Sequence, residues 1–209
     1  MSSANTHLQT PFIGASWLEA LSNICKPLSV ANRHWFRQII LAQLKGDTAL
    51  PHGLGLDNAS YLELKRAICS GTVDKQERAW LKPVHSLLRK RADTLDELID
   101  LRAKERNELI ALLFQYANQD EPFALEMAIV LASASLSASH LWRSLGLKQR
   151  SDLSALIKHN FPQLHALNHE NMRWKRFFYR SLCEQGGDYI CRAPSCGECS
   201  SYDECFVSG

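Results

Sequence analysis

The segment from Phe123 to Leu136 places the strongest constraint on how this chain can fold. It consists mainly of Ala, Leu, Ile, Val and Ser, with the charged residue Glu126 near its start. A helix that is apolar on all sides has to be covered by other elements. The overlapping uncharged stretch Met127 to Trp142 is rich in Ser and shorter than the ~20 apolar residues of a membrane helix. We therefore predict a buried helix in the middle of a bundle and no membrane span.

Helical patterns extend over most of the remaining chain. Between residues 35 and 44 apolar side chains recur at helical spacing, and Gly46 is a suitable helix end. Pairs of Ser or Thr with Glu three positions later, which can satisfy the free amides of a helix start, begin at Ser16, Ser60 and Thr94. Sustained alternation and enrichment in β-branched residues are both missing from the sequence. We therefore predict an all-α fold.

Two of the expected helices can be described further. The helix that begins near Thr94 is expected to be amphipathic, with its leucines turned inward: Leu95, Leu98, Leu101, Leu109, Leu112 and Leu113. Its charged residues are interpreted as a solvated face: Arg102, Lys104, Glu105 and Arg106. After a short helix capped by Ser151, a last long helix is expected from about Pro162 to Gln185, where Gly186 and Gly187 end it.

Charge and the N-terminal sequence bear on the class of protein. The 209 residues include 24 Lys and Arg against 22 Asp and Glu, a net charge of +2. This balance lacks the polybasic field of nucleic-acid-binding proteins. The first residues show no basic region followed by an apolar one, as an export signal would require. We therefore expect a cytoplasmic protein in a reducing compartment, with neither a nucleic acid nor a membrane as its partner.

Four of the seven cysteines lie within fifteen positions near the C-terminus: Cys191, Cys196, Cys199 and Cys205. In a reducing compartment such a cluster is more typical of metal binding than of disulfides. Structural zinc usually takes two C-x2-C pairs, and only Cys196 and Cys199 have that spacing. Iron–sulfur clusters tolerate more varied spacings, so the spacing leaves zinc and iron–sulfur open. We expect a polar tail over 1–15, a helical domain over 16–187 and a metal-binding segment over 188–209.

The C-terminal third of the chain, from about 140 to 206, resembles the NifQ family of nitrogen-fixation proteins. The resemblance lies in His140-Leu-Trp142, Leu145-Gly-Leu147, Asp152-Leu153, Asn160-Phe-Pro162, Met172 to Tyr179, Leu182-Cys-Glu184, the four-cysteine run, Tyr202-Asp203 and Phe206. It implies a carrier, not an enzyme, that holds a molybdenum–iron–sulfur cluster. The carrier would pass molybdenum, obtained from molybdate or another source, to the NifEN scaffold and NifH for assembly of the iron–molybdenum cofactor of nitrogenase.

By position in the family pattern, the resemblance makes Cys191, Cys196, Cys199 and Cys205 the cluster ligands. His140, His159 and Cys183 are candidates for accessory metal ligands, with a structural role as the alternative for each. A zinc-stabilised helical interaction module and an iron–sulfur electron carrier are the alternative functions.

Cations crowd the expected last helix just before the cysteines. Arg173 lies among them, and the candidates for contacts with molybdate or a partner are Lys175, Arg176, Arg180 and Arg192. They would offset an anionic cluster, attract molybdate or dock a partner. The alternative is an ordinary amphipathic helix whose aromatic residues enter the core and whose cations face water.

Overall fold

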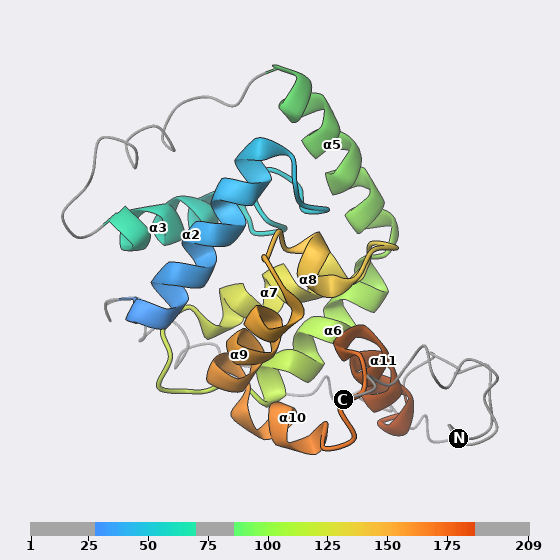
Figure 1. The fold of residues 1–209 in the computed structure, drawn as a ribbon. Coiled ribbons are helices and arrows are strands. Elements are labelled where there is room, and N and C mark those ends of the chain that lie inside the picture. Colours follow the sequence, from blue (N-terminus) through green and yellow to red (C-terminus); the bar gives the residue numbers. More distant parts are fainter. Residues whose placement is uncertain (1–27, 70–85, 187–209) are drawn as a thin grey trace, which may run out of the picture.

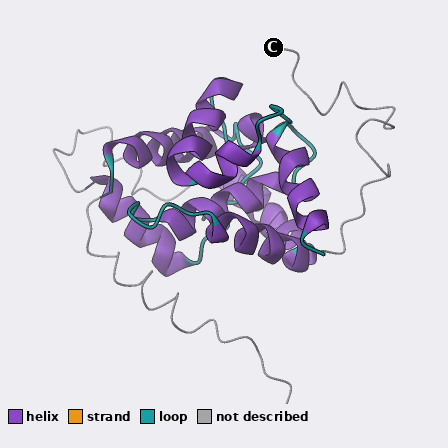
Figure 2. Cartoon of the chain, turned by 90° about the horizontal axis from the view of Figure 1, so that it is seen from below, coloured by secondary structure: helices purple, strands orange, loops and turns teal. Residues whose placement is uncertain are grey.

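The computed structural model describes residues 28–69 and 86–186, and within them it is all-α, with helices and no strands (Figures 1 and 2). The helices are α2 Val30–Lys45, α3 Asn58–Cys69, α5 Ser86–Leu101, α6 Ala103–Gln115, α7 Ala124–Ser135, α8 Leu141–Ser144, α9 Arg150–Asn160, α10 Pro162–Leu167 and α11 Trp174–Glu184. None of these helices is both long and apolar enough to cross a membrane. The predicted fold class is confirmed. The expected tail over 1–15, the Ser16 helix start and the segment over 188–209 lie outside the described residues.

Helix α7 is the buried centre of the fold, as predicted (Figure 1). Met127, Val130 and Leu131 are fully buried, and the helix packs mainly against α6 and also contacts α8. Glu126 lies in its first turn, where burial raises the pKa of its carboxyl group and nearby carboxylates add to the effect. The apolar composition of α7 therefore positions the helices around it.

Helices α2 and α3 follow the predicted pattern, with one difference at the start of α3. Helix α2 ends at Gly46, whose positive φ of 81° is readily adopted only by glycine. Helix α3 begins at Asn58 rather than at Ser60. The reason is that the Asp57 carboxylate accepts hydrogen bonds from the amides of Ala59 and Ser60, both at 2.9 Å. These bonds move the helix start upstream of the predicted pair.

The helix predicted from Thr94 is instead two helices. Helix α5 begins upstream at Ser86, and the chain breaks at Arg102 before α6. This break shifts the helical phase, so Leu98 and Leu101 are 53% and 82% exposed instead of buried. The three leucines of α6, Leu109, Leu112 and Leu113, are buried as predicted.

The prediction of a solvated charged face on this segment is wrong at Glu105, which is half-buried and accepts from Tyr179, and at Arg106. Arg106 Nε donates to Ser133 Oγ at 3.0 Å, and its Nη2 donates to the carbonyl oxygen of Gly55. Arg106 therefore ties α6 to α7 and to the loop before α3. Arg102 and Lys104 are exposed, as the prediction required.

The expected long helix from Pro162 to Gln185 is also wrong, because it is divided into α10 and α11. Between them the Asn168 side chain closes a turn: its Oδ1 accepts from the Met172 amide at 2.8 Å and its Nδ2 donates to the Met172 carbonyl at 2.9 Å. Asn171 in this turn has a positive φ of 54°. Helix α9 also begins at Arg150, after Gln149, so Ser151 is not its cap.

Candidate functional site

Helix α11 is the structural support nearest to the four cysteines in sequence. Cys191, Cys196, Cys199 and Cys205, together with Arg192, lie outside the described residues, whereas α11 ends at Glu184. Within the described residues no three His, Cys, Asp or Glu side chains gather as a metal site. The four cysteines predicted as the donor set for a metal or cluster therefore lie outside the described residues, which end just after α11.

The aromatic face of α11 fixes the helix on the domain. Trp174, Phe177 and Phe178 are buried, at 6%, 9% and 0% exposure, and Leu182 joins the same core cluster. Trp174 Nε1 donates to Ser154 Oγ of α9 at 3.0 Å. Burial of three aromatic rings stabilises the packing of a helix by several kcal/mol (about 2 or more for each ring). Helix α11 is therefore held in a fixed position on the domain.

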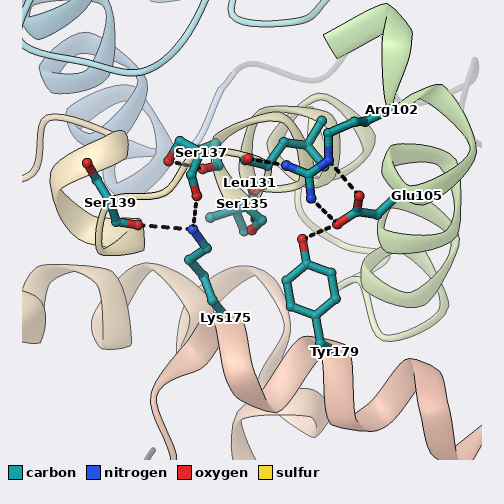
Figure 3. A network of polar contacts seen from close by, with 10 residues as sticks. Arg102, Glu105, Leu131, Ser135, Ser137, Ser139, Lys175 and Tyr179 are labelled. Atoms are coloured by element: carbon teal, nitrogen blue, oxygen red, sulfur yellow. Dashed lines mark hydrogen bonds and ion pairs between the residues drawn. The ribbon is translucent and has the colours of Figure 1, made fainter. Parts of the chain in front are cut away.

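Lys175 points into the fold instead of facing water (Figure 3). Its Nζ donates to the carbonyl oxygens of Ser137 and of Ser139, the latter at 3.0 Å. Burial, together with the nearby charge of Arg102, lowers the pKa of Lys175 to about 8, and Glu105 opposes this shift. The side chain thereby links α11 to the connection between α7 and α8.

Tyr179 makes a second polar link from α11 (Figure 3). Its hydroxyl donates to Glu105 Oε1 at 2.5 Å. The same carboxylate is held by Arg102, whose Nε and Nη2 donate to its two oxygens at 2.7 and 2.6 Å. A two-point guanidinium–carboxylate contact fixes orientation, so the network sets the position of α11 relative to α6.

The shifted pKa of Lys175 predicts a pH effect on stability. From about pH 8 to the unfolded value of 10.5, the unfolded state keeps a proton that the folded state has lost, so stability rises with pH in this window. Below pH 8 the half-buried charge destabilises the fold in full. Between about pH 7.5 and 10, we expect the urea midpoint of the wild type to rise relative to the urea midpoint of Lys175→Met. The exposed Lys148→Met should show no such gain, and parallel curves for all three proteins would contradict the assignment.

The remaining cations of α11 have different surroundings. Arg180 Nε donates to Glu184 Oε1 at 2.9 Å, and its Nη1 lies 3.5 Å from Glu170 Oε2. Arg176 is exposed on the same helix. The cations expected to act together thus point in different directions: Lys175 inward, Arg180 to neighbouring carboxylates and Arg176 to water.

The candidates for accessory ligands also differ in their surroundings. His159 Nε2 is 2.7 Å from Glu121 Oε2, and its ring lies against Trp35 with 5.4 Å between centroids. This nitrogen is therefore occupied by the carboxylate. His140 is exposed immediately before α8, and Cys183 is a half-buried free thiol in the last turn of α11.

Two cations near His140 were not recognised in the sequence, namely Arg143 on α8 and Arg150 at the start of α9. Desolvation lowers the pKa of His140, and these two cations lower it further together with Arg173 and Lys175. These residues come from separate segments with no regular spacing. The only signal in the sequence was the run of cations before the cysteines. Of the four cations near His140, that run contains Arg173 and Lys175.

These features define a class of protein: a small all-α protein whose last described helix, fixed by its aromatic face, precedes a run of four cysteines in the sequence. The family model for NifQ matches residues 35–207. "Protein NifQ" of Azotobacter vinelandii is 42% identical over 176 residues, which cover 84% of this chain and 88% of that protein. "Protein NifQ" of Klebsiella pneumoniae is 38% identical over 173 residues, which cover 82% of this chain and 96% of that protein. No solved structure matches the chain.

The chain belongs to the NifQ family. Members of this family are carriers and not enzymes, and they donate molybdenum for biosynthesis of the iron–molybdenum cofactor in nitrogen fixation. The resemblance seen in the C-terminal third is confirmed, and the match begins upstream at residue 35.

Proposed function

We propose that Cys191, Cys196, Cys199 and Cys205 hold a molybdenum–iron–sulfur cluster as the form in which this carrier delivers molybdenum. The observation that carries the proposal is the thiolate run itself, which lies inside the matched range 35–207. Soft thiolate ligands suit iron–sulfur clusters. Three of the thiolates would hold iron, and the molybdenum position would have a weaker, exchangeable ligand, since a donor has to release its cargo.

The fixed position of α11 on the domain also supports this proposal. A protein that binds a cluster must keep its ligands near one another while part of the cluster leaves. A fixed helix next to the ligands reduces the conformational entropy lost on binding. Cys183 in the last turn of α11 and the exposed His140 are the described side chains proposed as accessory ligands. His159 would have to bind through Nδ1, because Glu121 holds its Nε2.

The proposed acceptors are the NifEN scaffold and NifH, which would take molybdenum from this chain in a reducing, cytoplasmic compartment. The exposed Arg176 and the cation Arg192 next to the first cysteine are the proposed contacts to an acidic patch on a partner. Arg180 would contribute only if it exchanged its present carboxylate partners.

Replacement of the motif cysteines tests the proposal directly. Each of Cys191→Ser, Cys196→Ser, Cys199→Ser and Cys205→Ser is made in the full chain and purified without oxygen. Iron, molybdenum, sulfide and zinc are then measured per chain. We expect molybdenum and iron together in the wild type and a fall toward background in the variants, because each removes a thiolate ligand.

The matched control is Cys69→Ser, which removes a thiol on α3 outside the motif and should keep the metal content. Unchanged iron and molybdenum in all four motif variants would overturn the ligand assignment. Zinc without iron in the wild type would point to a zinc-stabilised module instead. Iron and sulfide that are reversibly reduced and never accompanied by molybdenum would point to an electron carrier.

A further inference from the structure

Two leucines near the end of α5 are exposed on one face of the helix. Leu98 and Leu101 are 53% and 82% exposed, and their spacing of three residues places them side by side. Thr94 and Glu97 share this face and are exposed as well, whereas Ile99 on the far side is buried. Helix α5 packs mainly against α6, and the described part of the chain leaves this face open to solvent.

Polar contacts hold the end of α5 in this orientation (Figure 3). Arg102 directly follows Leu101 and makes a two-point contact to Glu105, at 2.7 and 2.6 Å. It also donates to the carbonyl oxygen of Leu136 at the end of α7. Glu105 accepts from Tyr179 of α11 at 2.5 Å as well. The leucines are therefore exposed at a break that α6, α7 and α11 fix together, and not at a frayed helix end.

Carboxylates line one side of the two leucines. At 3.6 residues per turn, three acidic positions follow one another around α5 toward Leu101, namely Asp96, Asp100 and Glu97. All three are exposed. The cations of α5 lie in its first two turns, at residues 89–91, and its last turn has none. The end of α5 thus combines an apolar centre with an acidic edge.

The negative charge at the end of α5 is only partly compensated within the described residues. Burial lowers the pKa of Arg106, and the charges of Asp100 and Asp96 oppose this shift, so these two carboxylates interact with a cation of α6. Glu97, which borders the leucines, has no ion pair among the described residues. The helix dipole also makes cations favourable and carboxylates unfavourable at a C-terminal end. A partner that brings cations would offset the remaining charge.

We propose that the face of α5 formed by Glu97, Leu98 and Leu101, with Asp96 and Asp100 at its edge, binds a basic and partly apolar surface of another protein. The two leucines would form the centre of this contact, and the carboxylates favour a cationic rim on the partner. The same charge disfavours nucleic acid and anionic lipid. A second copy bound through the same face would bring carboxylates together, which is also unfavourable.

This face of α5 is connected to α11 through Glu105 (Figure 3). A partner bound at Leu101 would therefore lie beside the network that positions the helix preceding the four cysteines in the sequence. The proposed acceptors NifEN and NifH are the partners to test, and this choice rests on the proposed function. The contact differs from the one proposed for Arg176 and Arg192, since it takes cations from the partner.

Binding of the full chain to purified NifEN and NifH, measured by calorimetry without oxygen, tests the proposal. Leu98→Ser and Leu101→Ser should each weaken binding roughly tenfold, because each removes a leucine that the complex buries. Leu62→Ser and Leu167→Ser are the matched controls: these leucines of α3 and α10 are 48% and 52% exposed, and both variants should bind as the wild type does. Equal binding by the wild type, Leu98→Ser and Leu101→Ser would overturn the proposal.

A charge reversal tests the acidic edge separately. At low ionic strength Glu97→Lys should weaken binding roughly tenfold. Asp120→Lys, which reverses an exposed charge beyond the other end of α6, should bind as the wild type does. The wild-type complex should lose affinity as salt is added, since exposed charges are screened. Tighter binding by Glu97→Lys would show that the partner surface is acidic and would overturn the proposal.

Two further measurements test other occupants of this face. If another part of the same chain covered the leucines, Leu98→Ser and Leu101→Ser would lower the urea midpoint and Leu167→Ser would not. If a second copy covered them, light scattering would give the mass of two chains for the wild type and of one chain for Leu101→Ser. Either result would overturn the proposal. We expect unchanged urea midpoints and the same mass for all of these proteins.

Metal content separates this inference from the proposed function. Leu98→Ser and Leu101→Ser should keep the iron and molybdenum of the wild type, and their molybdenum transfer should fall in step with their binding. A wild type that carries molybdenum with iron but binds neither NifEN nor NifH would overturn the docking face and leave the cluster proposal standing. A wild type without molybdenum whose binding still depends on these two leucines would support the docking face and overturn the cluster proposal.

Discussion

Gly146→Ala is expected to lower the free energy of unfolding by about 3 kcal/mol, the sum of a backbone and a packing effect. Gly146 has a positive φ of 69°, which costs an alanine about 1 to 2 kcal/mol. A Cβ at this position would overlap the Cβ of Ala42 on α2 and lie 3.0 Å from Thr48 Cγ2. The first contact is between short side chains that cannot rotate away, so α8 would have to move from α2.

Gly186→Ala is the matched control, because Gly186 has a similar φ of 85° and no atom of the described residues lies within 4 Å of an added Cβ. Since no described residue meets the added Cβ, it should cost only the backbone effect, about 1 to 2 kcal/mol. Urea unfolding of both variants measures the difference. Equal losses of stability would show that the contact with Ala42 carries no energy, contrary to the packing described here.

Gly146 lies in the turn between α8 and α9. The Gly146 amide donates to the carbonyl oxygen of Arg143 at 2.9 Å, and Arg150 begins the next helix. The tight turn thus links the stability of the domain to the spacing of two of its cations.

Local sequence patterns predicted those helices whose ends or faces are marked by residue type. Helix α7 followed from its composition, and the end of α2 followed from Gly46. The break at Arg102 had no such mark, since neither glycine nor proline occurs there. Arg102 is held at the break by a two-point contact to Glu105 and by a bond to the Leu136 carbonyl, which depends on the tertiary fold.

The turn between α10 and α11 did have a sequence signal of a weaker kind. Asn168 and Asn171 are residue types that favour turns, because asparagine bonds to nearby backbone and tolerates positive φ. The aromatic and apolar periodicity on both sides outweighed them in the prediction of one long helix. The structure shows that the Asn168 side chain, with two bonds to Met172, decides the outcome.

The candidate site divides in the same way. The cysteine run is a local pattern, so spacing was enough to propose it from the sequence. The cations around His140 meet only because α8, α9 and α11 are brought together by packing, with the Trp174 to Ser154 bond as one of the fixed points. No spacing rule relates Arg143 and Arg150 to Arg173, so this group could be found only in three dimensions.

Asn160→Ala should cost about 3 kcal/mol, through lost hydrogen bonds and an unpaired buried amide. Asn32 and Asn160 are both fully buried, and their side-chain amides bond reciprocally at 2.7 and 2.9 Å. Asn160 Nδ2 also donates to the Leu156 carbonyl at 3.0 Å. The pair joins α2 to the end of α9, so its loss would loosen the packing of α9 that positions Arg150. Asn58→Ala, at an exposed position of α3, is the matched control and should change stability by less than about 0.5 kcal/mol.

The double variant Asn32→Leu/Asn160→Leu tests why the pair matters. Each single change leaves a buried amide without its partner, whereas the double change removes both polar groups. If the reciprocal bonds carry the effect, the double variant should lose less stability than the two single leucine variants added together, with a coupling of about 1 kcal/mol or more. Simple additivity in urea unfolding would mean that the cost is one of shape alone. A coupling of the expected sign would show that α9 is held in place against α2 by an uncharged polar contact in the core.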